Sequence, residues 1–170
     1  LVGSPIPVPI DICDVALSGS RIYAFPRNGW GKIYTVLLST LALSTSTQNI
    51  YNTFKVRLHP LGSAIYAGST GVSPGDFHKV SIPTNGIAQY SYDSQYHGDY
   101  PMGDDLWLSA SGDRLFGSGG AIFALNPAAT TNATDLTYAG TLEGFGSYNY
   151  GWVTSLRSSA GLNELAVIPA

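Results

Sequence analysis

The chain has 170 residues, enough for one domain with its own core. Charged residues make up only 11% of it and hydrophobic residues 44%, and much of the remainder is Ser, Thr, Gly and Asn. The net charge is −3 and the eight basic residues are scattered singly, which excludes nucleic acid as a partner because phosphate binding needs clustered Lys and Arg.

The first unit of the chain is predicted to contain four short strands. Residues 15–25, VALSGSRIYAF, consist of an apolar strand, a Ser/Gly turn and an aromatic strand. GKIYTVLLS from Gly31 supplies a third strand, and the more polar LALSTSTQ from Leu41 a fourth. The chain contains no run of about 18 apolar residues, so no membrane span is predicted.

The same order of elements recurs along the chain. Residues 56–68, VRLHPLGSAIYAG, and residues 106–118, LWLSASGDRLFGS, repeat the first two strands. DFHKVSIPT and GAIFALNPA follow as third strands, and GIAQYSY and DLTYAGTLE as fourth strands. A further copy begins at Trp152 with strands at 152–156 and 164–168.

Four strands in about 40 to 45 residues is the period of a β-propeller blade. We therefore predict an all-β fold of propeller blades with four antiparallel strands each. Complete blades are expected at about 9–51, 52–104 and 105–146, and partial blades at 1–8 and 147–170. The alternative, a β-sandwich of similar hairpins, gives no reason for the order of elements to recur in step.

The opening segment resembles a known repeat. LVGSPIPVPIDICDVALSGSRIYAF followed by GKIYTVLLST is similar to the YVTN-type β-propeller repeat of bacterial and archaeal surface proteins, with an outer strand ending in Val-Gly, a Pro, an inner strand, a Ser/Gly turn and an aromatic strand. The usual Asp before Gly in the turn and the Tyr-Val-Thr-Asn string are absent. The resemblance covers the whole chain as repeats and implies a propeller fold and a secreted or cell-surface location.

A ring of six to eight blades needs roughly twice this length, so we expect the chain to be part of a larger ring. The rest of that propeller, or a second chain, is then an expected partner. The alternative is a closed four-bladed ring in which Leu1–Val8 completes the blade that begins at Trp152.

Binding residues are expected on one face of the propeller, where the loops between second and third strands and between successive blades open. Aromatic residues gather in these loops, including Tyr51, Phe77 and Phe145. Tyr and Trp suit binding of a protein or a carbohydrate because they combine a large apolar area with a polar tip. The predicted ligand-binding residues are Trp30, Tyr96, His97, Asp99, Tyr100, Tyr148, Tyr150 and Trp152.

The longest of these loops, predicted at 90–107, concentrates carboxylates. Together with backbone carbonyls they could supply the six to eight oxygens that Ca²⁺ takes. Their spacing matches no calcium motif, and Asp side chains also cap turns. We therefore predict no cofactor, with Ca²⁺ as the metal alternative at Asp93, Asp99, Asp104 and Asp105.

The resulting functional prediction is a non-catalytic binding module of a secreted or surface propeller. Catalytic motifs are poor, because no Gly-x-Ser-x-Gly elbow is present and His59 falls in a turn on the opposite face from the other histidines. The alternative is part of a propeller enzyme, a lactonase-like hydrolase or a quinone-type dehydrogenase. Asp99, Asp104 and His97 would be its candidate residues.

Overall fold

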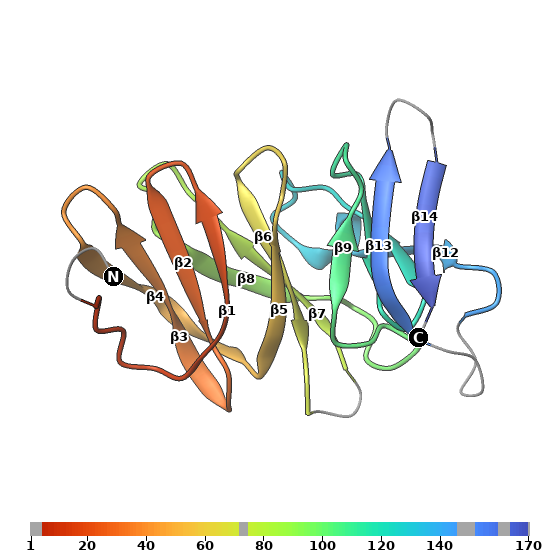
Figure 1. Cartoon of the computed structure of the whole chain (residues 1–170), viewed down its shortest axis with the longest axis horizontal. Helices are drawn as coiled ribbons and strands as arrows, with labels where there is room; N and C mark the ends of the chain where they lie inside the picture. The colour runs from red at the N-terminus through yellow and green to blue at the C-terminus, as the bar shows by residue number, and fades with distance from the viewer. Residues whose placement is uncertain (1–4, 72–74, 146–151, 160–163, 170) are drawn as a thin grey trace.

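Four antiparallel sheets stand side by side in a row (Figure 1). A computed structural model describes residues 5–71, 75–145, 152–159 and 164–169. Three sheets have four strands in sequential order and the last has two. We call them blade 1, blade 2, blade 3 and the end hairpin. The predicted all-β class with four-stranded antiparallel blades is confirmed.

The strands follow one another in a simple meander. Blade 1 contains β1 (Ile12–Ser18), β2 (Arg21–Pro26), β3 (Trp30–Leu37) and β4 (Ala42–Tyr51). Blade 2 contains β5 (Thr53–Leu58), β6 (Ala64–Ser69), β7 (Phe77–Ser81) and β8 (Gln89–Asp93). Blade 3 contains β9 (Leu106–Leu108), β10 (Arg114–Gly117), β11 (Ala121–Ala124) and β12 (Thr137–Thr141), with a short 3₁₀ helix, η1 (Asn132–Thr134), before its last strand. The end hairpin contains β13 (Val153–Ser159) and β14 (Glu164–Pro169).

The row of sheets is open. Figure 1 shows blade 1 and the end hairpin at opposite ends of it, so residues 5–8 do not complete the end hairpin as the closed-ring alternative required. Residues 5–11 form no strand, because Pro5, Pro7 and Pro9 lack the N–H groups that a ladder needs. Within the described residues, no helix is long and apolar enough to cross a membrane.

Apolar layers between neighbouring sheets hold the row together. Between blades 1 and 2 lie buried side chains that include Tyr23, Phe25, Ile33 and Ile65. Burying such side chains stabilises each by about 1.5–3 kcal/mol. Between blades 2 and 3 lie Tyr66, Phe77, Met102, Leu115 and Phe123, and between blade 3 and the end hairpin lie Phe116, Val153 and Leu156.

Strand β7 shows how alternation divides the residues of one strand between two layers. Phe77 packs edge-on against Phe123 of blade 3, whereas Val80 belongs to the layer beside blade 1. Successive side chains of a strand point to opposite faces. Lys79 therefore lies on the same face as Phe77, and His78 on the same face as Val80. The expectation that Phe77 lies in a binding loop is therefore wrong, because this ring is fully buried.

A buried ion pair joins blades 2 and 3. Lys79 Nζ lies 3.3 Å from Asp135 Oδ2, and the two side chains are 1% and 0% exposed. The Asp135 carboxylate also accepts hydrogen bonds from the hydroxyls of Tyr66 and Tyr92 and from the Asn126 backbone N–H. Lys79 Nζ donates to the Ala129 carbonyl at 2.8 Å. Each charge is thus both paired and hydrogen-bonded, which buried charges require.

We expect Asp135→Asn to lower the free energy of unfolding by roughly 3–5 kcal/mol, because the Lys79 ammonium would remain buried without its counter-charge. Urea denaturation measures this loss. The matched control is Asp113→Asn, since Asp113 pairs with Arg114 at the surface and should change stability by less than about 1 kcal/mol. Equal stability losses in the two variants would show that the buried pair is not needed.

Candidate functional site

The connections β2–β3, β4–β5, β6–β7, β8–β9 and β10–β11 lie at one end of the blades, which we call the loop face; it is the lower edge in Figure 1. Hydrogen bonds link neighbouring connections there. Asn52 N–H donates to the Gly29 carbonyl, and Thr70 N–H donates to the Asn52 carbonyl. These bonds fix the ends of β3 and β6 relative to each other.

A cleft of about 230 Å³ opens between blades 1 and 2 at this face. We call it the acidic cleft. Trp30, at the start of β3, is 68% exposed, and its ring lies 4.9 Å from that of Tyr51 at the end of β4. Blade 2 supplies the more deeply buried lining. The lining residues are Trp30, Tyr51, Ser69, Asp76, His78, Tyr90 and Asp93.

Asp76 is held firmly beside β7. One carboxylate oxygen accepts the Phe77 backbone N–H at 2.7 Å and the Ser94 hydroxyl at 2.6 Å. The other lies 2.9 Å from His97 Nδ1. Burial raises the pKa of Asp76 to about 6, opposed by the two hydrogen bonds and reinforced by the nearby Asp93 charge.

Asp93 reaches the cleft because of an irregularity in the β7–β8 ladder. Val80 pairs with Tyr90 and Lys79 with Tyr92, so Ser91 is an extra residue on β8. A β-bulge of this kind reverses the alternation beyond it. His78 consequently pairs with Asp93, and the two side chains share the face toward blade 1. Asp76, Asp93 and His97 then form a cluster whose potential ligand atoms all lie within 4.8 Å of one another.

His78 is the unusual residue of this site. Its side chain is 6% exposed, and neither ring nitrogen has a hydrogen-bond partner among the residues that the structure describes. Its ring lies edge-on to Tyr90 at 5.9 Å. Burial lowers the pKa of His78 to about 4, so the imidazole is neutral at pH 7 and keeps a lone pair on one nitrogen.

The predicted binding residues do not form one site. Trp30 lines the acidic cleft and His97 joins its carboxylates. Tyr96 and Tyr100 pack on blade 3 instead, and the Tyr100 ring stacks on Tyr138 at 3.5 Å. Their rings therefore pack the 94–105 connection onto blade 3 and do not form an exposed binding surface. Trp152, 57% exposed, stands at the start of the end hairpin, and Tyr148 and Tyr150 lie outside the described residues.

The four predicted calcium ligands are also dispersed. Asp93 lies in the cluster, but Asp104 accepts a hydrogen bond from the Thr70 hydroxyl and Asp105 pairs with Arg57 at 2.9 Å. Asp99 is exposed. The predicted loop 90–107 is shorter in the structure, because residues 89–93 form β8 and the connection spans 94–105. Asp76 and His78 were not among the predicted site residues. Their alternate positions place a carboxylate two residues from a histidine, and this spacing was the available signal.

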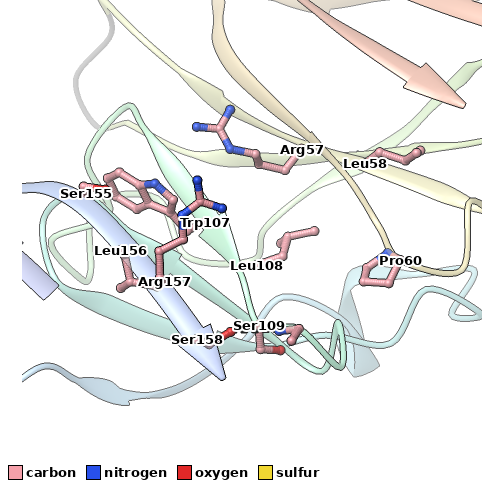
Figure 2. Close-up of a pocket in the computed structure, with 11 residues that line it drawn as sticks. Arg57, Leu58, Pro60, Trp107, Leu108, Ser109, Ser155, Leu156, Arg157 and Ser158 are labelled. Atoms are coloured by element: carbon pink, nitrogen blue, oxygen red, sulfur yellow. Dashed lines mark hydrogen bonds between the residues drawn. The ribbon is translucent and has the colours of Figure 1, made fainter. Parts of the chain in front are cut away.

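A second groove, of about 470 Å³, runs along the inner strands β5, β9 and β13 (Figure 2). Trp107, Leu108 and Leu156 line it together with two arginines, Arg57 and Arg157. Arg57 is already neutralised, because it pairs with Asp105 and lies 3.6 Å from Asp14 of β1. The Arg57 contacts join three successive blades, so this arginine has a structural role.

The fold is similar to that of known β-propeller proteins. No protein-family model matches the sequence, and no curated protein matches it significantly. A candidate 6-phosphogluconolactonase from Bacteroides fragilis aligns with 71% of the chain at 17% identity and a TM-score of 0.53. The chain spans 35% of that protein's length. The computationally designed protein Ika4 aligns over 99% of both chains at 13% identity and a TM-score of 0.58. At these identities the likeness concerns the fold alone.

Glycines allow the 94–105 connection to lie directly on blade 3. A Cβ at Gly117 would stand 2.0 Å from the Met102 carbonyl oxygen, and one at Gly119 would stand 2.2 Å from that of Pro101. Met102 is buried in the layer between blades 2 and 3. The GSGG segment, residues 117–120, thus fixes the path of the connection that carries His97.

We expect Gly117→Ala to lower the free energy of unfolding by about 1–3 kcal/mol, since overpacking must displace the Met102 backbone. Thermal or urea denaturation measures the change. Gly75→Ala is the matched control, because its added Cβ would meet only the Gly103 carbonyl at 3.9 Å. A Gly117→Ala variant as stable as Gly75→Ala would contradict the close approach.

Proposed function

We propose that this chain is a non-catalytic binding module and that the acidic cleft takes a carbohydrate. The observation that carries the proposal is the pairing of the exposed Trp30 ring and Tyr51 with the carboxylates of Asp76 and Asp93 in one cleft. An aromatic face suits the C–H face of a sugar ring, and carboxylates accept hydrogen bonds from its hydroxyls.

The size of the cleft agrees with a small ligand. Sites for drug-sized molecules occupy roughly 300–1,000 Å³, and this cleft measures about 230 Å³. One sugar ring against Trp30, with its hydroxyls directed toward Ser69 and Asp93, matches this volume and lining. The low-charge composition and the resemblance to surface propellers support a secreted or cell-surface location for such a module.

The arrangement of Ser94, Asp76 and His97 favours binding over nucleophilic catalysis. In a hydrolase triad the imidazole stands between the serine and the carboxylate and removes the serine proton. Here the carboxylate of Asp76 stands in the middle and contacts both the Ser94 hydroxyl and His97. Asp104, a candidate residue of the enzyme alternative, accepts a hydrogen bond from Thr70 instead. That alternative therefore requires His97, beside Asp76, to activate a water molecule as a general base.

We also propose that a second chain or a further propeller segment covers the free face of blade 1. Leu17, Ile22, Val36 and Leu43 are successive partners across its four strands and form one apolar row, in which Leu17 and Leu43 are exposed and Val36 is buried. Leu17 is 61% exposed, and Val15, on the same face, is 51% exposed. Propeller blades normally bury this face against a neighbour.

We expect a panel of soluble mono- and disaccharides to include one that binds the wild type, and Trp30→Ala to weaken that affinity roughly tenfold, the equivalent of about 1.4 kcal/mol of lost stacking contact. Isothermal titration calorimetry gives the dissociation constants. Trp152→Ala, which removes a similarly exposed ring elsewhere on the chain, should leave the affinity unchanged. Equal losses in both variants, or binding only of amines, would overturn the proposal.

We expect the isolated wild type to self-associate and Leu17→Lys to reduce the association, because a charge in the apolar row opposes its burial. Sedimentation velocity over a concentration series measures both. Leu61→Lys is the control, since Leu61 is equally apolar and even more exposed but lies in the β5–β6 turn. A wild type that stays monomeric throughout the series would argue against a covered face.

A further inference from the structure

Three side chains that line the acidic cleft, Asp76, His78 and Asp93, have the chemistry of metal ligands, and His97 lies beside them. Asp76, Asp93 and His97 bring one ligand atom each to within 4.8 Å of the others. His78 lines the same cleft and pairs with Asp93 across the β7–β8 ladder. Two carboxylates and one imidazole therefore converge, and the His78 imidazole lies on the same cleft but outside the 4.8 Å group.

His78 is the independent observation that points to a ligand. Both of its buried ring nitrogens lack a partner in the described residues, and leaving a buried polar group unpaired costs roughly 1–3 kcal/mol. A neutral imidazole has one nitrogen with a free lone pair, which is the form that binds metal. A cation in the cleft would pair with that nitrogen and neutralise the two carboxylates at once.

We propose that Asp76, Asp93 and His97, with His78 as the fourth ligand, bind a divalent transition-metal ion such as Zn²⁺ in the acidic cleft. Zn²⁺ takes imidazole nitrogen and carboxylate oxygen at about 2.0–2.2 Å, whereas Ca²⁺ takes six to eight oxygens and would gain little from two histidines. The ligand chemistry thus favours Zn²⁺ over the calcium alternative derived from the sequence.

The surroundings of the cluster are those of a prearranged site. Asp76 is oriented by the Phe77 N–H and the Ser94 hydroxyl, which are the outer contacts that hold metal-binding carboxylates in place. Ligands of a tetrahedral zinc ion lie roughly 3.3 Å apart, so the cluster has to contract from its 4.8 Å limit. His97 is exposed and lies in a connection between strands, so it can make this movement. The His78 ring on β7, which lies outside the 4.8 Å group, has to turn toward the carboxylates.

The test is a titration of the chelator-treated protein with Zn²⁺ alone, by isothermal titration calorimetry. We expect one saturable site per chain, and His97→Ala and Asp93→Asn should each weaken it at least tenfold. Both side chains can be removed without disturbing the buried layers. Asp99→Asn, an exposed carboxylate of the same connection, is the matched control and should bind as the wild type does.

Co²⁺ provides a second readout that a general loss of stability would not reproduce. Bound by two imidazoles and two carboxylates in a four-coordinate site, it should give visible absorption bands that His78→Asn weakens or shifts. Absence of saturable Zn²⁺ binding, retention of full affinity in both His97→Ala and Asp93→Asn, or tighter binding of Ca²⁺ than of Zn²⁺ would overturn the proposal. Because no sugar is present, these outcomes are independent of carbohydrate binding.

Discussion

The buried pair of Lys79 and Asp135 is the constraint on which the arrangement of blade 2 depends. Two opposite charges, almost completely removed from water, tolerate little change in position because each must keep its partner and its hydrogen bonds. The pair fixes the position of β7 against blade 3. Since side chains alternate along a strand, the direction of Lys79 determines the direction of its neighbour His78. The interaction that joins blades 2 and 3 therefore orients the cleft between blades 1 and 2.

The class of fold could be predicted from the sequence because it depends on a repeated pattern. Apolar strands, Ser/Gly turns and aromatic strands recur with the period of a blade, and each blade has the same need to bury both of its faces. Trp30 could be placed at the loop face for the same reason, because it directly precedes the third strand predicted from Gly31. At residues 5–9, prolines remove backbone donors, and this segment forms no strand.

The site could not be predicted as well, because it depends on contacts outside the repeat. The bulge at Ser91 turns Asp93 toward His78, and a shift of one residue would turn its carboxylate to the opposite face. No residue type in QYSYD, residues 89–93, marks that bulge. Asp105 and Asp104 are also acidic, but Asp105 pairs with Arg57 and Asp104 accepts a hydrogen bond from Thr70. Both partners lie far away in the sequence. Composition identified the acidic connection but not which carboxylates face the cleft.

The two ends of the 94–105 connection are held by different means, and the difference bears on the binding that we propose for the cleft. Ser94 is fixed by its N–H bond to the Phe77 carbonyl and by its hydroxyl bond to Asp76, whereas Pro101 and Met102 lie against Gly119 and Gly117 of blade 3. His97 stands between these anchors and is exposed. The strand residues Asp93 and His78 have fixed positions in the cleft lining, and His97, which contacts Asp76 beside it, can adjust. A ligand or ion bound between them would contact residues that the strands already hold in place, and only the His97 side chain and, for an ion, the His78 ring would have to move. The entropic cost of ordering a long loop on binding would therefore be small.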